Sequence, residues 1–218
     1  MRQNHALTVL LVVEGFALFV GAPLASLGRT EPLVGAGLLG VVVTLALVIL
    51  SPDVMSKVLA VVAMVLCAGG AAVRLSHPSL VTSWLGHGAV IVAVAAISLV
   101  VGRVVFGPGR VTHYRIQGAV ILYLNLAIVF GSAYRLIAET AAGAFTNYPG
   151  HPSELAAESS MLYFSFTCLT STGMGEMLPV HPVARSLTNL EAVIGQLYLT
   201  ILLARLVTLH VASASERS

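Results

Sequence analysis

The segment whose residue types most clearly suggest chemistry is Thr-Ser-Thr-Gly-Met-Gly-Glu, residues 170–176. Glycine reaches backbone angles closed to other residues, so two glycines separated by one residue let successive carbonyl groups turn the same way. Four such strands around one axis would stack rings of oxygen that can replace the water around a cation. One copy cannot surround an ion, so this interpretation requires an oligomer. The alternative is that the segment is only a flexible loop.

The residues around this segment predict a short helix that enters apolar surroundings and then turns back. Residues 161–170 are apolar but too few to span a bilayer. Hydroxyl and acidic residues at 153–159 suit a helix start, and Pro179 follows the glycines. Irregular backbone at membrane depth is tolerated only where protein buries it or where it lines a water-filled cavity. The sequence therefore predicts a re-entrant loop.

The composition excludes an ordinary soluble enzyme. Of 218 residues, 57% are hydrophobic and 9% charged, and the mean hydropathy is +0.95, whereas soluble domains are about 25% charged. We therefore expect an integral membrane protein with almost no extramembrane mass. A net charge of +2 gives no indication of a nucleic-acid partner. Cys67 and Cys168 lie in apolar runs, which predicts buried thiols and no disulfide framework.

Hydropathy predicts an all-α membrane protein with six transmembrane helices and one re-entrant pore helix. The expected spans are residues 6–27, 33–50, 54–75, 80–106, 111–139 and 183–209. The expected organisation is a four-span N-terminal module at 1–106, a linker at 107–115, a pore domain at 116–212 and a polar tail at 213–218. With the N-terminus inside, seven Lys and Arg residues face the cytoplasm and four face outside. This bias favours cytoplasmic N- and C-termini.

Two stretches resemble a known family. Residues 163–176 resemble the pore helix and selectivity filter of the tetrameric potassium channels, whose filter usually reads Thr-Val-Gly-Tyr-Gly-Asp. Residues 190–198 resemble the inner helix of bacterial channels of this class. Gly195 lies 20 residues after Gly175, the separation that the family has between its hinge glycine and the second filter glycine. The resemblance covers about residues 111–209, and before them it extends only to the layout of four spans ahead of a pore module.

The resemblance also implies where a monovalent cation would bind. Backbone carbonyls of residues 171–175 would coordinate it, and the hydroxyl of Ser171 or Thr172 would add oxygen at the inner end. Four Glu176 side chains would ring the pore mouth and raise the local cation concentration. The implied filter residues are Thr170, Ser171, Thr172, Gly173, Met174 and Gly175.

Further residues are implied in supporting and gating this filter. The supporting residues are Tyr163, Phe164, Thr167 and Glu191, and Tyr163 is expected to reach Glu176. Gly195 is expected as a gating hinge, with a close helix contact as an equal alternative because glycine is also common there.

The filter departs from the family pattern at four positions. Ser171 replaces the family's threonine, Thr172 replaces valine, Met174 replaces tyrosine and Glu176 replaces aspartate. The largest change is at Met174, because a thioether cannot donate the hydrogen bond that the tyrosine gives to the surrounding aromatic residues. We therefore expect a filter less rigid than usual.

Three further ionisable residues of the predicted spans are candidates for a specific role. Glu14 is expected to pair with a polar group of a neighbouring helix, because ionisable groups at membrane depth are costly and usually partnered. The alternative is a gating or proton-sensing role. His87 predicts a polar helix contact, with a pH switch as the alternative. Arg205 is expected to extend to the membrane interface.

These patterns together predict a passive monovalent cation channel, most simply for potassium, in which four copies each contribute one filter segment. Arg103, Arg110 and Arg115 cluster at or beyond the end of the fourth span, so steep voltage gating is not expected. The expected location is the plasma membrane, with other copies of the chain and lipid as partners and K+ as permeant ion. No enzymatic activity, other cofactor or nucleic-acid partner is expected. The alternatives are a weakly selective cation channel and a non-conducting channel-like membrane subunit.

Overall fold

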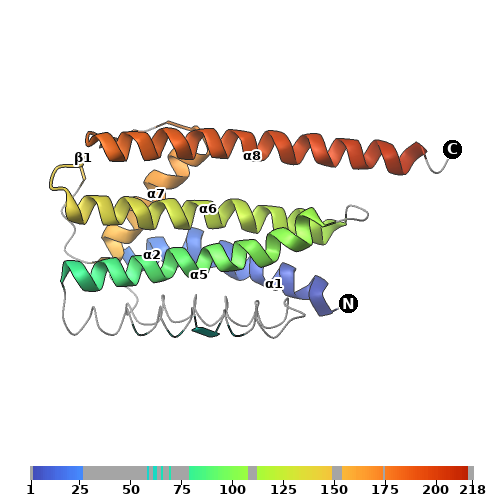
Figure 1. Cartoon of the computed structure of the whole chain (residues 1–218), viewed down its shortest axis with the longest axis horizontal. Helices are drawn as coiled ribbons and strands as arrows, with labels where there is room; N and C mark the ends of the chain where they lie inside the picture. Colours follow the sequence, from blue (N-terminus) through green and yellow to red (C-terminus); the bar gives the residue numbers. More distant parts are fainter. Residues whose placement is uncertain are drawn as a thin grey trace.

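The structure is a computed structural model, which describes residues 2–26, 79–107, 112–148, 154–173 and 175–215, with isolated residues between 58 and 69. The described part is built from long helices with one short antiparallel strand pair (Figure 1). The predicted second and third spans and Met174 lie outside the described residues, apart from the isolated positions.

The first span begins as α1, Arg2–Phe16, widens into a π-helix, η1, Ala17–Gly21, and continues as α2, Ala22–Ser26. The amide of Ala22 donates to the carbonyl of Ala17, five residues back. Pro23 explains a departure here, because its ring would meet the carbonyl four residues earlier in a regular α-helix. The sequence analysis did not predict this wider turn.

Two long helices, α5 and α6, pack antiparallel beside α1 (Figure 1). Helix α5, Leu80–Phe106, starts at a capping box in which Ser79 and Thr82 each accept the other's backbone amide. Helix α6 is His113–Thr140. A buried aliphatic cluster joins the three helices; its members include Leu7, Leu10, Ile97, Val101 and Ile121.

The remaining helices are α7, Glu154–Leu169, and α8, Pro182–Ser215. Strand β1, Phe145–Thr146, follows α6 and pairs antiparallel with β2, Leu178–Pro179, just before α8. This pairing brings the chain back, after α7, to the end of the helices where α6 finished. Figure 1 shows α7 crossing behind α6, from the side of α5 toward α8.

Helix α7 begins at Glu154, within the stretch 153–159 that suited a helix start and ahead of the apolar run at 161–170. Residues 154–160 are helical as well, because Ala156 and Ala157 are buried and hold this polar turn in the fold. Aromatic rings fix the helix further along: Phe164 packs edge-on against Tyr134 of α6 at 5.0 Å and against Phe145 of β1 at 5.4 Å, between ring centroids.

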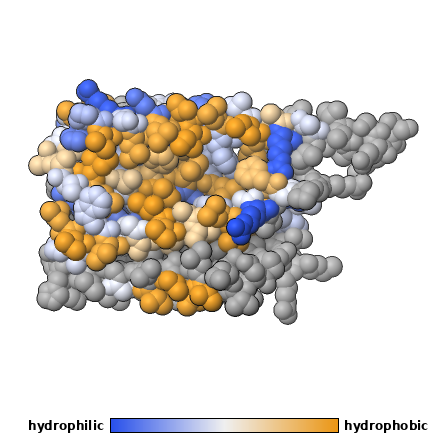
Figure 2. Space-filling model, in the orientation of Figure 1, coloured by the Kyte–Doolittle hydropathy of each residue, from blue (hydrophilic) through white to orange (hydrophobic). Residues whose placement is uncertain are grey.

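The outer surface of the described part is strongly apolar. Large aliphatic side chains are exposed along α1 and α5, among them Val9, Val12, Val81, Val92 and Leu99. Figure 2 shows hydrophobic residues over much of the described face, with the most hydrophilic ones mainly toward its two ends. Four described helices are long and apolar enough to cross a membrane, within Leu7–Leu24, Leu80–Arg103, His113–Thr140 and Pro182–Arg205. The prediction of an all-α membrane protein is confirmed.

Candidate functional site

Residues 170–176, called the glycine-rich segment below, begin where α7 ends. The amide of Ser171 donates to the carbonyl of Cys168 at 3.0 Å, and Ser171 has the left-handed backbone that closes many helices (φ 54°). Two residues later, Gly173 has φ 102°, a conformation that favours glycine. Its amide donates to the carbonyl of Thr167 at 3.3 Å. The chain thus reverses within a few residues and folds back on the last turn of α7.

The predicted filter residues that the structure describes lie together on this reversal. Thr170, Ser171, Thr172, Gly173, Gly175 and Glu176 are all exposed in the single chain. The Thr170 and Thr172 hydroxyl oxygens are 2.7 Å apart. Met174 is outside the described residues, so its packing stays a prediction. The segment therefore lies at an exposed surface of the single chain, with the Thr170 and Thr172 hydroxyl groups side by side.

The returning strand is fixed at its other end. Asn147 donates from Nδ2 to the carbonyl of Glu176 at 3.0 Å, and Arg185 of α8 donates from Nε to the carbonyl of Pro179 at 3.1 Å. Val180 donates its amide to the carbonyl of Ala144 at 2.8 Å. These bonds tie the segment to the loop after α6 and to the start of α8.

A buried carboxyl group joins α6, α7 and α8 behind the segment. Tyr134 donates to Oε2 of Glu191 at 2.6 Å, and Ser165 Oγ contacts Oε1. All three side chains are fully buried. Ser165 Oγ also lies 2.9 Å from the carbonyl of Ala127. One hydroxyl proton cannot serve both oxygens, so both contacts are hydrogen bonds only when Oε1 of Glu191 carries a proton.

The other predicted supporting residues take different positions. Phe164 is buried in the aromatic cluster, and Thr167 donates its hydroxyl to the carbonyl of Phe164 at 2.7 Å. Tyr163 instead is 55% exposed, and the structure shows no hydrogen bond between Tyr163 and Glu176. The expected contact between these two residues is therefore absent within one chain, because Tyr163 lies on the outward side of α7.

The inner end of the segment meets the middle of α6 and α8. The carbonyl of Leu169, the last residue of α7, accepts a hydrogen bond from Tyr123 of α6 at 3.0 Å. A Cβ atom on Gly195 would overlap that same carbonyl oxygen. Gln196 donates from Nε2 to Ser171 Oγ at 2.9 Å. Gly195 thus makes a close helix contact, and its role as a hinge stays a prediction, since α8 is helical throughout.

Sequence reasoning missed four contact residues here: Tyr123, Tyr134, Ser165 and Gln196. One signal was available, because a polar side chain in an apolar helix needs a partner. Which side chains pair depends on how the helices pack, and helical periodicity alone does not give that.

Two polar residues in the outer spans have different surroundings. Glu14 is 5% exposed and its Oε1 has no hydrogen-bond partner, so the predicted structural pairing is not seen at that atom. His87 Nε2 of α5 lies 3.4 Å from Oε1 of Glu158 of α7, which makes it a polar contact between helices.

A polar network lies near the β1–β2 end of the molecule. Arg135 pairs with Glu139 at 2.9 Å and donates to the Tyr148 hydroxyl at 3.0 Å, while Ser83 of α5 donates to Glu139. Burial raises the pKa of the Tyr148 phenol above its usual range, and the Arg135 guanidinium opposes that rise. The network joins α5, α6 and the loop that precedes α7.

Arg205 of α8 binds at the opposite end. It donates to the carbonyls of Val105 and Gly107, both at 3.2 Å, and its guanidinium lies 5.0 Å from the centre of the Phe106 ring. It therefore caps the C-terminus of α5, and its extension to the membrane interface stays a prediction.

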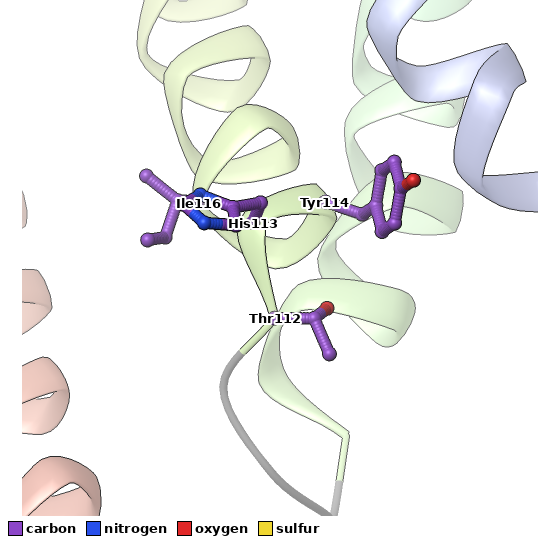
Figure 3. A pocket seen from close by; sticks show the side chains of 4 residues that line it. All are labelled: Thr112, His113, Tyr114 and Ile116. Carbon is purple, nitrogen blue, oxygen red and sulfur yellow. The ribbon is translucent and has the colours of Figure 1, made fainter.

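A hollow of about 410 Å³ opens beside the start of α6, lined by Thr112, His113, Tyr114 and Ile116. Figure 3 shows His113 and Ile116 on one side of the helix and Tyr114 on the other. The hollow lies at the end of α6 remote from the glycine-rich segment, and no predicted filter residue lines it.

Comparison with known proteins agrees with this arrangement. Residues 120–211, from α6 through most of α8, match the family model described as ion channel. No curated protein and no solved structure matches the chain. Residues 120–211 therefore form an ion channel domain, and the match covers most of α6 and α8 together with α7 and the glycine-rich segment.

Proposed function

We propose that the protein is a passive monovalent cation channel in which four copies surround a central path and potassium is the preferred ion. The observation that carries this proposal is the exposed reversal at 170–176, in a chain with an ion channel domain. Carbonyls of residues 171–175 and the hydroxyls of Ser171 and Thr172 would coordinate the ion. Thr170 would add a further oxygen at the inner end.

The end of α7 supports this assignment. Its C-terminus points to the middle of α6 and α8, where Tyr123 and Gly195 meet Leu169. A helix C-terminus carries a partial negative charge, so four of them would stabilise a cation there. Four Glu176 side chains would form the outer mouth, and bending of α8 at Gly195 would open the path. In the plasma membrane both termini would face the cytoplasm.

The surface of α8 supports assembly with further copies. Its exposed residues Leu190, Val193, Leu197 and Ile201 recur at helical spacing, and each is more than half exposed in the single chain. An apolar row beside the glycine-rich segment suits contact with other copies of α8 or with lipid. One filter segment per chain requires such assembly.

A second candidate is a weakly selective cation channel. It is favoured by Tyr163, which is exposed and makes no hydrogen bond to Glu176, and by methionine at 174. Without these bonds the filter would adapt its width to sodium as well.

The test is the reversal potential of purified protein in a planar bilayer with potassium on one side and sodium on the other. A value near the potassium equilibrium potential supports a selective channel. Current that reverses near zero supports the weakly selective alternative. If no current passes, Met174→Tyr is measured next: restored current assigns the defect to the filter, and continued silence in both proteins supports a non-conducting subunit. Cross-linking in detergent reports whether the purified species is a tetramer.

A further inference from the structure

The Ser171 side chain by itself does little to fix the direction of its hydroxyl group. A threonine would be branched at Cβ and therefore stiff about χ1, whereas serine rotates more freely. Ser171 is also exposed in the single chain and lies at the left-handed turn that ends α7. A serine hydroxyl at an ion site therefore needs a neighbour to fix its direction.

Gln196 supplies that neighbour from another helix. Its Nε2 atom donates to Ser171 Oγ at 2.9 Å. The preceding residue fixes where Gln196 stands, because the backbone of Gly195 lies directly against the carbonyl of Leu169. The amide thus approaches the base of the glycine-rich segment from a rigid contact, although the side chain itself is exposed on the open face of α8.

We propose that Gln196 is a positioning residue that orients the Ser171 hydroxyl at the innermost cation site and so replaces the constraint of the missing methyl group. This inference rests on the proposed channel function. One lone pair of Ser171 Oγ accepts the amide N–H, which leaves the second lone pair for the cation. The amide is neutral, so it fixes the oxygen without placing another charge beside the ion.

The experiment compares wild type with Gln196→Leu, Ser171→Thr and the double variant. Potassium that binds the folded protein raises its melting temperature, so titration with KCl at constant ionic strength gives a half-saturating concentration without any need for current. We expect Gln196→Leu to raise that concentration about fivefold, the equivalent of one lost hydrogen bond. Ser171→Thr should restore it in the double variant. The potassium-to-sodium permeability ratio in bilayers should fall and recover in the same order.

Thr200→Val is the matched control. Thr200 lies one turn beyond Gln196 on the same face, and its hydroxyl donates only within α8, to the carbonyl of Gln196; it should leave the potassium titration unchanged. If the leucine variant does not assemble, the nearly isosteric Gln196→Glu takes its place, because a carboxylate accepts where the amide donates. The role of Gln196 is overturned, and the channel proposal is not, if Gln196→Leu has the same half-saturating potassium concentration as wild type. The same holds if Ser171→Thr does not restore that concentration in the double variant. A wild type with neither potassium binding nor current removes the channel proposal and this inference together.

Discussion

Glu191 shows what a single side chain contributes to this fold. Its two carboxyl oxygens meet Tyr134 of α6 and Ser165 of α7, and all three residues are fully buried. A buried polar group that loses its partner costs about 1–3 kcal/mol. The carboxyl group therefore holds α7 in place from the side away from the glycine-rich segment.

Glu191→Ala and Glu191→Gln should differ in stability because of this geometry. The alanine variant removes the acceptor of the Tyr134 hydroxyl and the contact between Glu191 and Ser165, which keeps only the Ala127 carbonyl, and we expect about 3 kcal/mol of lost stability. The glutamine variant should stay near wild type, since its oxygen accepts from Tyr134 and its amide donates to Ser165, as a protonated carboxyl does. The measurement is the melting temperature of the purified protein in detergent. If glutamine were as harmful as alanine, the site would need an ionised carboxylate.

Gly195 gives a second prediction for a single residue. A methyl group there would overlap the Leu169 carbonyl, which is backbone and cannot rotate away. We expect Gly195→Ala to displace α8 from α7 and to abolish cation flux into liposomes. Gly102→Ala is the control, because a Cβ on Gly102 meets no atom within 4 Å. Equal flux in both variants would show that the contact between α7 and α8 loosens at little cost.

The bounds of a helix agree with the prediction from the sequence where composition alone determines them. Helix α5 spans Leu80–Phe106, as predicted, because its interior lacks charge and glycine with proline ends it. Helix α7 starts at Glu154, within the polar stretch 153–159 whose residue types suited a helix start, although the apolar stretch at 161–170 alone would have placed the start later. The π-helix at Ala17–Gly21 was missed because the hydropathy pattern does not change there. The filter residues were predicted from their types and stay a prediction, whereas the contacts behind them depend on helix packing, which the sequence does not give.

Arg205 connects two of these helices, which gives a prediction at this scale. Hydrogen bonds from a charged donor contribute about 1.5–3 kcal/mol, so Arg205→Gln should lower the melting temperature clearly. Arg205→Lys should recover only part of the loss, because an ammonium group lacks the planar fork that meets the carbonyls of Val105 and Gly107. Arg103→Gln removes an exposed charge from the last turn of α5 and serves as control. Similar decreases in melting temperature in Arg103→Gln and Arg205→Gln would contradict the interpretation that Arg205 caps α5.

The described molecule is continuous across the predicted boundary between N-terminal module and pore domain. Leu7 and Leu10 of α1 share a buried cluster with Ile121 of α6. The ring of Phe19 in the π-helix packs on Phe166 of α7, with centroids 5.5 Å apart. Residues 120–211 carry the ion channel match, so the first span packs directly on α7 within that domain of its own chain. The boundary at 106–116 stays a prediction of organisation and does not separate two cores.

Helix α8 carries three side chains that bind other parts of the chain: Glu191 contacts Ser165 of α7, Gln196 contacts Ser171 of the glycine-rich segment, and Arg205 contacts the end of α5. Protein synthesis runs from the N-terminus, so α5, α6 and α7 leave the ribosome before any of these partners exists. During that interval the Tyr134 and Ser165 hydroxyls and the last carbonyls of α5 lack their final hydrogen bonds in an apolar bilayer. A nascent chain halted before α8 therefore lacks these polar partners. Insertion of α8 supplies the Glu191 carboxyl group to Tyr134 and the Arg205 guanidinium to the end of α5.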